Sequence, residues 1–256
     1  MSDRPVALIT GGASGIGRAL AHRLGETHRI VVADRDAEGA AAVAESVNGT
    51  SVTVDLTDPA ASDKAVSATV SAYERLDVVC LNAGITTGEW DVEKIGIDRY
   101  RTVVALNQDA VFYGVQAAVP ALRNSGGGAI VVTSSLGGLV GQPDDPVYCM
   151  TKHAVIGLVR SLATPLGVHG IRIVAMCPGF ADTALLADYI EAFRTANFPL
   201  LRAEDVADAA VAAVEAGGTG EAWVLQPGRE PVNYQFKGVP GPRAEGFDGS
   251  LPPTLI

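Results

Sequence analysis

Short apolar runs alternate with longer amphipathic stretches from the start of the chain to about residue 226. The short runs are rich in β-branched residues and almost continuously apolar, which is typical of strands covered on both faces of a parallel sheet. They predict strands at Val6–Thr10, Ile30–Ala33, Ser51–Val54, Val78–Leu81, Ala129–Thr133, Arg172–Met176 and Ala222–Leu225.

The stretches between these strands carry apolar residues at helical spacing. They predict helices at Ile16–Gly25, Ala37–Val47, Pro59–Tyr73, Ile97–Leu122, Tyr148–Val168 and Ala203–Ala216. Capping residues support two of the starts, because Asp36 precedes one helix and Asp58 followed by Pro59 opens the next. The alternation predicts the α/β class, as a single doubly wound Rossmann domain with a parallel sheet of about seven strands and helices on both faces.

Two segments interrupt this alternation. Residues 182–201 follow the sixth predicted strand and are apolar, which predicts a helical lid over a substrate pocket. Residues 228–256 are rich in Gly and Pro, so we expect an extended tail that lies over the body or a neighbouring subunit, with disorder as the alternative. The dinucleotide-binding domain is therefore expected to span residues 1–227.

Composition narrows the functional classes. Hydrophobic residues make up 48% of the 256 residues, and the net charge of −10 disfavours binding to nucleic acid. No apolar run approaches the roughly 20 residues of a membrane helix, and the start lacks the apolar core of a signal peptide. The three cysteines form no CxxC pair and the four histidines have no ligand spacing. We expect a cytoplasmic protein without a metal site or a membrane partner.

A glycine-rich turn, Thr10–Gly17, joins the first predicted strand to the first predicted helix. Gly11, Gly15 and Gly17 permit a tight turn, and the free amides of the helix start favour an anionic group. The spacing is GxxxGxG and differs from the general GxGxxG fingerprint, and glycine turns also serve ordinary loops. Its position between strand and helix predicts a dinucleotide pyrophosphate here, with Ser14 and Ile16 in the same turn.

Asp34 ends the second predicted strand, 17 residues after Gly17. A carboxylate there can accept hydrogen bonds from both adenosine ribose hydroxyls and would repel a 2′-phosphate. Helix capping is the alternative role. Uncharged Ser14 also favours NAD, whereas the adjacent Arg35 leaves NADP open, so we expect NAD to be preferred.

Tyr148 and Lys152 lie four residues apart, which places them on one face of a helix. A free phenol has a pKa near 10, and a nearby ammonium favours the phenolate and lowers that pKa. Solvated Tyr–Lys pairs are common on helices, so the pair gains meaning only from its context. Ser134 and Ser135 end the fifth predicted strand, at the edge where parallel sheets bind ligands, and the chemistry does not choose between them.

These features together resemble the single-domain, non-extended short-chain dehydrogenases/reductases over about residues 5–226. The matching motifs are Thr10–Gly17, Asn82-Ala83-Gly84, Asn107, Ser135, Tyr148, Lys152 and Pro178-Gly179. The family's catalytic serine lies about 13 residues before the tyrosine, and this resemblance selects Ser135. It also implies that Asn107 helps to hold a water relay to Lys152.

The resemblance implies further cofactor contacts. Asn82, Ala83 and Gly84 would lie beneath the adenosine ribose, and Asp55 with Leu56 would contact the adenine, although Asp55 is also a candidate helix cap. The residues that would seat the nicotinamide carboxamide are Pro178, Gly179, Ala181 and Thr183.

The implied reaction is hydride transfer between the nicotinamide and a secondary alcohol or ketone. Ser135, Tyr148, Leu185 and Leu186 are expected to contact the substrate, and the apolar lid predicts a steroid, a cyclic or aryl ketone, or a hydroxyacyl thioester. The lid's apolar residues are Leu185, Leu186, Tyr189, Ile190, Phe193, Phe198, Leu200 and Leu201, and Gly138, Leu139 and Val140 are candidates for the opposite wall. A non-catalytic dinucleotide sensor or scaffold and an epimerase or dehydratase relative are the alternatives.

The resemblance also implies a homotetramer, or a homodimer, in which the two long helices and the last strand pack against other subunits. We expect Val111, Val115, Ile156 and Val159 to be exposed apolar positions on these helices.

Overall fold

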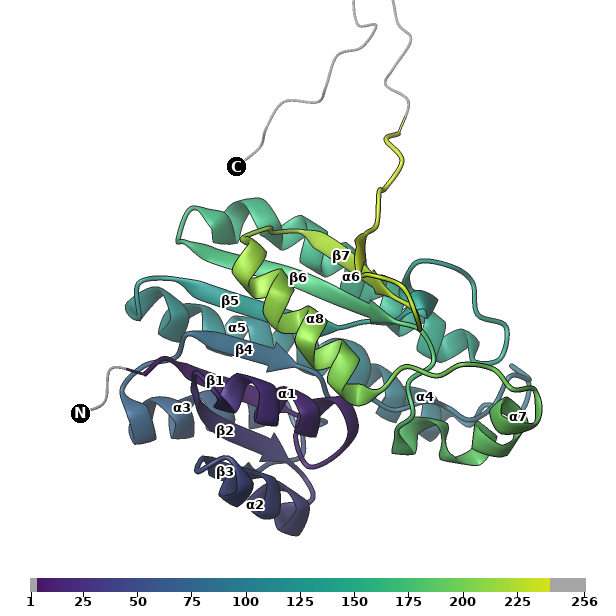
Figure 1. Cartoon of the computed structure of the whole chain (residues 1–256), viewed down its shortest axis with the longest axis horizontal. Helices are drawn as coiled ribbons and strands as arrows, with labels where there is room; N and C mark the ends of the chain where they lie inside the picture. The colour runs from purple at the N-terminus through teal and green to yellow at the C-terminus, as the bar shows by residue number, and fades with distance from the viewer. Residues whose placement is uncertain (1–3, 240–256) are drawn as a thin grey trace, which may run out of the picture.

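The computed structural model describes residues 4–239 and shows one twisted sheet with helices on both faces (Figure 1). The eight strands follow the order β3-β2-β1-β4-β5-β6-β7-β8, in which all neighbours are parallel except β7 and β8. Their bounds are Val6–Thr10 (β1), Arg29–Asp34 (β2), Thr50–Thr53 (β3), Val78–Leu81 (β4), Gly128–Thr133 (β5), Ile171–Pro178 (β6), Glu221–Leu225 (β7) and Val232–Asn233 (β8). The α/β class and the doubly wound parallel sheet are confirmed, with the short antiparallel β8 added.

The helices largely match the predicted ones. Their bounds are Gly15–Gly25 (α1), Ala37–Ser46 (α2), Ala61–Tyr73 (α3), Ile97–Val104 (α4), Ala110–Asn124 (α5), Pro146–Gly167 (α6), Ile190–Thr195 (α7) and Ala203–Ala216 (α8). A π-helix at Ala105–Asp109 (η1) and 3₁₀ turns at Leu136–Gly138 (η2) and Ala184–Tyr189 (η3) complete the described elements. The long helix predicted at Ile97–Leu122 is therefore divided in two by the π-helix.

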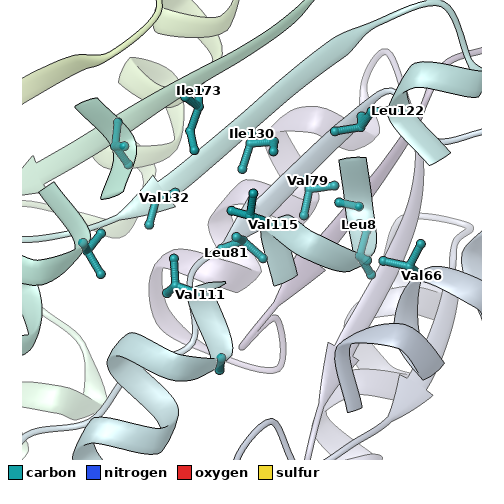
Figure 2. Close-up of a cluster of buried hydrophobic side chains, with 14 of the residues drawn as sticks. Leu8, Val66, Val79, Leu81, Val111, Val115, Leu122, Ile130, Val132 and Ile173 are labelled. Carbon is teal, nitrogen blue, oxygen red and sulfur yellow. The ribbon is translucent and has the colours of Figure 1, made fainter. Parts of the chain in front are cut away.

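Each face of the sheet carries its own apolar core. Helices α1, α2 and α8 cover one face, and α3, α5 and α6 cover the other. Figure 2 shows the second core, where side chains from β1, β4, β5 and β6 meet those of the covering helices. Every described strand from β1 to β6, except the outer β3, is almost wholly buried, which explains its nearly continuous apolar sequence.

One expectation about these helices is wrong. Val111, Val115, Ile156 and Val159 were expected at the surface, but each is buried in the second core, and Figure 2 shows Val111 and Val115 directed into it. These side chains provide the apolar stripe with which α5 and α6 pack on the sheet. The exposed apolar residues of this region are different ones, including Ile97, Phe112 and Met150.

The segment 182–201 contains η3 and the short helix α7, at the carboxyl edge of the sheet (Figure 1). Its two ends lie side by side, because the Asp182 amide donates to the Leu201 carbonyl and the Leu201 amide donates to the Phe180 carbonyl, both at 2.9 Å. The rings of Phe180, Phe193 and Phe198 form a cluster with centroids 4.7–6.0 Å apart. The lid is thus partly helical and anchored to the body at its base.

The described part of the tail follows β7. Val232 and Asn233 form β8 against the outer edge of β7, and Phe236 packs on the second core. The guanidinium carbon of Arg160 in α6 lies 3.9 Å from the centre of the Phe236 ring. The tail up to this point lies over the body, and its remainder, residues 240–256, is outside the described residues.

Candidate active site

A cleft of about 530 Å³ lies at the carboxyl edge of the sheet, where the strand order reverses between β1 and β4. This is where open α/β sheets bind ligands. The predicted site residues that line it are Gly11, Ser14, Gly15, Ile16, Asp34, Arg35, Asp55, Leu56, Asn82, Ala83, Gly84, Ser135, Tyr148, Lys152, Pro178, Gly179, Ala181, Thr183, Leu185 and Leu186. Gly17 and Asn107 do not line the cleft but contact residues that do, since Gly17 packs against Gly11 and Asn107 hydrogen-bonds Ile85.

The glycine turn is packed so tightly that side chains would disrupt it. Gly11 has a φ of 63° and Gly15 a φ of 51°, which L-residues rarely adopt. A Cβ on Gly11 would lie 2.8 Å from the Ala83 Cα, and a Cβ on Gly17 would overlap the Gly11 carbonyl oxygen. The turn therefore exposes backbone amides at the start of α1, and the cradle fits a dinucleotide pyrophosphate.

Asn82 holds this turn against the neighbouring strands. Its amide nitrogen donates to the carbonyls of Thr10 and Gly11 at 3.3 Å, and its amide oxygen accepts from the Thr133 hydroxyl at 3.0 Å. The carboxyl ends of β1, β4 and β5 are thereby connected by one side chain. The floor of the cleft is fixed before any ligand binds.

Asp34 faces the glycine turn from the end of β2. One carboxylate oxygen accepts from the Ala13 amide and the other accepts from the Asp36 amide, both at 3.0 Å. Asp34 therefore binds turn amides and does not cap a helix, since Asp36 caps α2. The ribose role is compatible with this geometry, because a carboxylate oxygen accepts more than one hydrogen bond. Hydrogen bonds from Thr57 lower the pKa of the nearby Asp55 carboxyl, with a smaller contribution from the charge of Arg35.

Tyr148 and Lys152 lie on α6 and face the cleft together. The Lys152 Nζ lies 5.5 Å from the centre of the Tyr148 ring and donates to the Thr133 carbonyl at 2.8 Å. Burial lowers the pKa of Lys152 to about 8 and raises the pKa of Tyr148 to about 12, where a hydrogen bond with Ser135 opposes the rise. The expectation that the ammonium lowers the pKa of Tyr148 is therefore wrong for the ligand-free protein, in which burial raises that pKa.

The two serines at the end of β5 differ in their surroundings. The Ser134 side chain is buried and donates to the Lys152 carbonyl at 3.1 Å. Ser135 lines the cleft, hydrogen-bonds Tyr148 and accepts from the Gly137 amide at 3.1 Å. Ser135 is therefore the serine that can reach a substrate oxygen, while Ser134 secures the helix.

Asn107 lies in the π-helix and points towards the loop after β4. Its amide group pairs with both backbone groups of Ile85, accepting at 2.9 Å and donating at 2.8 Å, and also donates to the Thr151 hydroxyl at 3.3 Å. A Cβ on Gly84 would lie 3.3 Å from the Asn107 oxygen and 3.4 Å from the Lys152 Nζ. The loop, Asn107 and Lys152 thus converge at one point.

The substrate end of the cleft is mainly apolar. Leu185, Leu186 and Phe180 line it from the lid side, and Leu136 and Ile85 line it elsewhere. The opposite wall was expected to contain Gly138, Leu139 and Val140, but none of these lines the cleft, because Gly138 packs against Ser134 and Lys152 and Val140 points to solvent. Of the lid's apolar residues, Phe193 and Phe198 form the aromatic cluster and Leu201 is buried at the base.

Sequence reasoning missed several residues at this site. Thr133 and Ile85 bind Lys152 and Asn107 through their backbones, so their side-chain types carry no signal. Gln142 lines the cleft from a loop that no motif marks. Asp145 caps α6, and the Asp145-Pro146 pair is the same start signal that identified the helix after Asp58-Pro59.

Within residues 4–239, no three His, Cys, Asp or Glu side chains are grouped as a metal site would need. No helix in the same range combines the length and apolarity required to cross a membrane.

Comparisons with known proteins agree with this geometry. A family model described as short chain dehydrogenase matches residues 5–192. Cyclohexanol dehydrogenase from Acinetobacter sp. (strain SE19) is 35% identical over 206 residues, which cover 78% of this chain and 82% of that enzyme. Levodione reductase from Leifsonia aquatica is 36% identical over 193 residues, or 72% of each protein.

A solved structure is also similar throughout the body of the chain. The 3-ketoacyl-(acyl-carrier-protein) reductase from Brucella melitensis, complexed with NADH, superposes with a TM-score of 0.83 at 30% identity. The match covers 88% of this chain and 98% of that one.

Proposed function

The chain belongs to the short-chain dehydrogenase/reductase family and is an NAD(P)-dependent oxidoreductase of apolar secondary alcohols, and we propose that it oxidises cyclic ones to ketones with NAD. The observation that carries this proposal is the placement of Ser135, Tyr148 and Lys152 around one cleft with an apolar substrate end. The names of the relatives support the ring shape of the substrate, since one of them acts on cyclohexanol.

We assign the cofactor residues of the cleft to four parts of the dinucleotide. Backbone amides of the Gly11–Gly17 turn would hold the pyrophosphate, Asp34 the adenosine ribose, and Asp55 with Leu56 the adenine. Asn82, Ala83 and Gly84 would lie under that ribose, while Pro178, Gly179, Ala181 and Thr183 would seat the carboxamide. A bound nicotinamide supplies the acceptor or donor of the hydride.

The reacting groups are assigned by their reach. Ser135 Oγ donates a hydrogen bond to the substrate oxygen and stabilises its developing charge. Tyr148 Oη, as phenolate, takes the hydroxyl proton during oxidation and returns it during reduction. Lys152 would hold the nicotinamide ribose, and its charge would favour the phenolate. Asn107 holds the loop after β4 through Ile85 and would support a water relay that carries the proton from Lys152.

A phenol with a pKa near 12 would be a poor base at neutral pH, so this assignment requires further positive charge beside Tyr148. A protonated Lys152 provides one charge and an oxidised nicotinamide ring another. Alcohol oxidation should consequently become faster as the pH rises through the pKa of Tyr148 in the ternary complex.

Asp34 supports the preference for NAD. Replacing it with Asn keeps one acceptor for the Ala13 amide but removes the charge that repels a 2′-phosphate. We expect Asp34→Asn to lower the ratio of kcat/KM with NAD to that with NADP by roughly tenfold or more. Asp58→Asn, the same change at an exposed helix start, is the matched control and should leave the ratio unaltered. An unchanged ratio in Asp34→Asn would remove the basis for the preference.

A panel of alcohols tests the reaction itself. Cyclohexanol, 2-butanol, lactate and a primary alcohol, each with NAD and with NADP, separate ring shape, charge and alcohol class. We expect the highest kcat/KM for cyclohexanol with NAD and little turnover of lactate, because the described residues at the substrate end are mainly apolar and would not stabilise its carboxylate. A protein that binds NAD but turns over none of these alcohols, nor the corresponding ketones, would be a sensor and not a dehydrogenase.

The assembly and location are part of the same proposal. Exposed apolar residues on α4, α5 and α6, including Ile97, Phe112 and Met150, support a homodimer formed through these helices. A homotetramer would need a second interface beside β7. Cys80, Cys149 and Cys177 are buried free thiols, which supports a reducing, cytoplasmic location. Light scattering of the purified protein measures the assembly.

A further inference from the structure

Asp145 is a buried carboxylate that binds two separate parts of the active site. Only 4% of its surface is exposed. One oxygen accepts from the Tyr148 amide at 2.9 Å, which caps α6, and the other accepts from the Thr87 amide at 2.6 Å. Tyr148 belongs to the helix that carries the reacting groups, whereas Thr87 belongs to the loop after β4.

This loop lines the cleft and is held by side chains from three elements. Asn107 of the π-helix binds both backbone groups of Ile85, and the Arg99 guanidinium of α4 donates to the carbonyls of Thr86 and Thr87. Of these three side chains, Asp145 is the one that caps α6. Because its two carboxylate oxygens bind the loop and the start of α6 separately, Asp145 connects these two segments.

We propose that Asp145 is a positioning residue: its two hydrogen bonds fix the Tyr148 end of α6 relative to the loop after β4, and its negative charge acts on the Tyr148 side chain. This proposal rests on the proposed function in one respect, which is the choice of cyclohexanol as the substrate of the first experiment below. It adds a fifth side chain to Asn107, Ser135, Tyr148 and Lys152, and this side chain acts through Tyr148 without touching the substrate.

The charged groups around Tyr148 decide the direction of the effect. Burial is the main cause that raises the pKa of Tyr148, while the charge of Asp145 raises it further and the buried thiol of Cys177 in β6 acts in the same direction. Lys152 lies on the same helix, and Arg99 approaches from α4 on the far side of Thr87. Removing the charge of Asp145 alone should therefore favour the phenolate.

Two variants separate charge from position. Asp145→Asn is neutral and can accept from only one of the two amides, so it loses both the charge and one hydrogen bond. Asp145→Glu keeps the charge but moves the carboxylate by one methylene. Asp77→Asn is the matched control, because Asp77 also accepts from a backbone amide, that of Val6, but lies at the opposite edge of the sheet.

Two quantities are measured for each variant: the pH profile of kcat for cyclohexanol oxidation at saturating NAD, and the thermal stability. We expect the inflection point of the pH profile to move to lower pH in Asp145→Asn and to stay at its native pH in Asp145→Glu. In both variants the plateau of kcat should fall by roughly tenfold to 100-fold, because small misplacements of a reacting group are costly. Asp77→Asn should lose thermal stability and keep the native profile.

Two results would overturn the proposal. An inflection in Asp145→Asn at the native pH would show that the charge does not act on Tyr148. Plateau values that simply follow thermal stability, as in Asp77→Asn, would show that Asp145 is only structural. If the native enzyme does not oxidise cyclohexanol, the proposed substrate is wrong, and the absorbance of the phenolate tests Asp145 independently. The part of this absorbance that is absent from Tyr148→Phe belongs to Tyr148, and it should appear at lower pH in Asp145→Asn than in the native protein. An unchanged pH would refute the charge effect.

Discussion

A neutral tyrosine and a lysine with a lowered pKa occupy the same buried corner of this protein. Desolvation disfavours the charged form of each, so burial acts against the ion pair that catalysis of alcohol oxidation requires. The hydrogen bonds from Lys152 to Thr133 and between Ser135 and Tyr148 partly compensate. A positively charged ligand beside the phenol would therefore favour the phenolate.

The Tyr148 hydroxyl should be essential for turnover but not for cofactor binding. We expect Tyr148→Phe to lower kcat by about 10²–10⁴-fold, the usual contribution of a general acid–base, while the Kd for NAD changes little. Tyr73→Phe, which removes a hydroxyl bonded to Thr50 on β3, is the control and should keep native turnover. Native kcat in Tyr148→Phe would exclude the assignment.

Lys152 should make stability depend on pH in the cofactor-free protein. Its pKa is about 8 in the folded state against an ordinary 10.5, so the unfolded chain binds more protons between these values. Lys152 should therefore contribute roughly 2 kcal/mol more to the free energy of unfolding at about pH 9.5 than at about pH 7. Burial raises the pKa of Cys80 and Cys177 to about 12, and these thiols act in the opposite direction above about pH 9. The contribution of Lys152 is therefore measured as the difference in slope between the native protein and Lys152→Met, by urea unfolding at both pH values. A variant that keeps the native slope would contradict the lowered pKa.

The sequence predicted several single residues that the structure brings to the cleft. Glycines, Asp34, Ser135, Tyr148 and Lys152 could be predicted because the role expected of each depends on its side chain, or on the lack of one. Thr133 and Ile85 contribute backbone carbonyls, which any residue type offers, so no pattern could reveal them. The pKa values also depend on burial, which spacing along a helix does not determine.

At the scale of elements, the π-helix is the clearest departure from the predicted pattern. Apolar spacing favours one continuous helix over residues 97–122, and a single wider turn barely disturbs that spacing. The turn places Asn107, which is wholly buried, against the loop after β4. A local rule could not anticipate it, because the reason for the distortion is a contact with a distant segment.

The glycine turn gives the sharpest prediction at this scale. Gly17→Ala would place a methyl group on the Gly11 carbonyl, so we expect weaker NAD binding by at least roughly tenfold and a loss of roughly 2 kcal/mol in stability. Gly167→Ala is the control, since a Cβ there meets nothing within 4 Å and helix propensity favours alanine by about 1 kcal/mol. Calorimetry measures both quantities. Native NAD affinity in Gly17→Ala would show that the turn can relax.

At the scale of the whole molecule, the tail contributes to the fold in a way that its composition conceals. Scattered apolar residues among Gly and Pro indicate no regular element, yet β8 covers the outer edge of β7 and Phe236 reaches the second core. An uncovered strand edge is a site for unwanted pairing. The parallel sheet itself was predictable from alternation alone, whereas this cover depends on contacts between distant segments.

Phe236 should therefore contribute more to the stability of the fold than its place in a tail implies. We expect Phe236→Ala to lower the free energy of unfolding by roughly 2 kcal/mol, from lost apolar contact and the lost interaction with Arg160. Val239→Ala is the control, because Val239 is 91% exposed and should change little. Equal stability of the two variants in urea unfolding would mean that the tail is not bound.

The paired backbone of Ala181 and Leu201 has a consequence for how such a protein can diversify. This single parallel bridge joins the two ends of the lid to each other. Ser135, Tyr148 and Lys152 lie outside the lid, so we expect them to stay in place when the residues between these ends are inserted, deleted or exchanged. New specificities could thus be acquired by changing one contiguous stretch of the gene, and a designer could graft a lid from another enzyme at the same two residues while keeping the reaction.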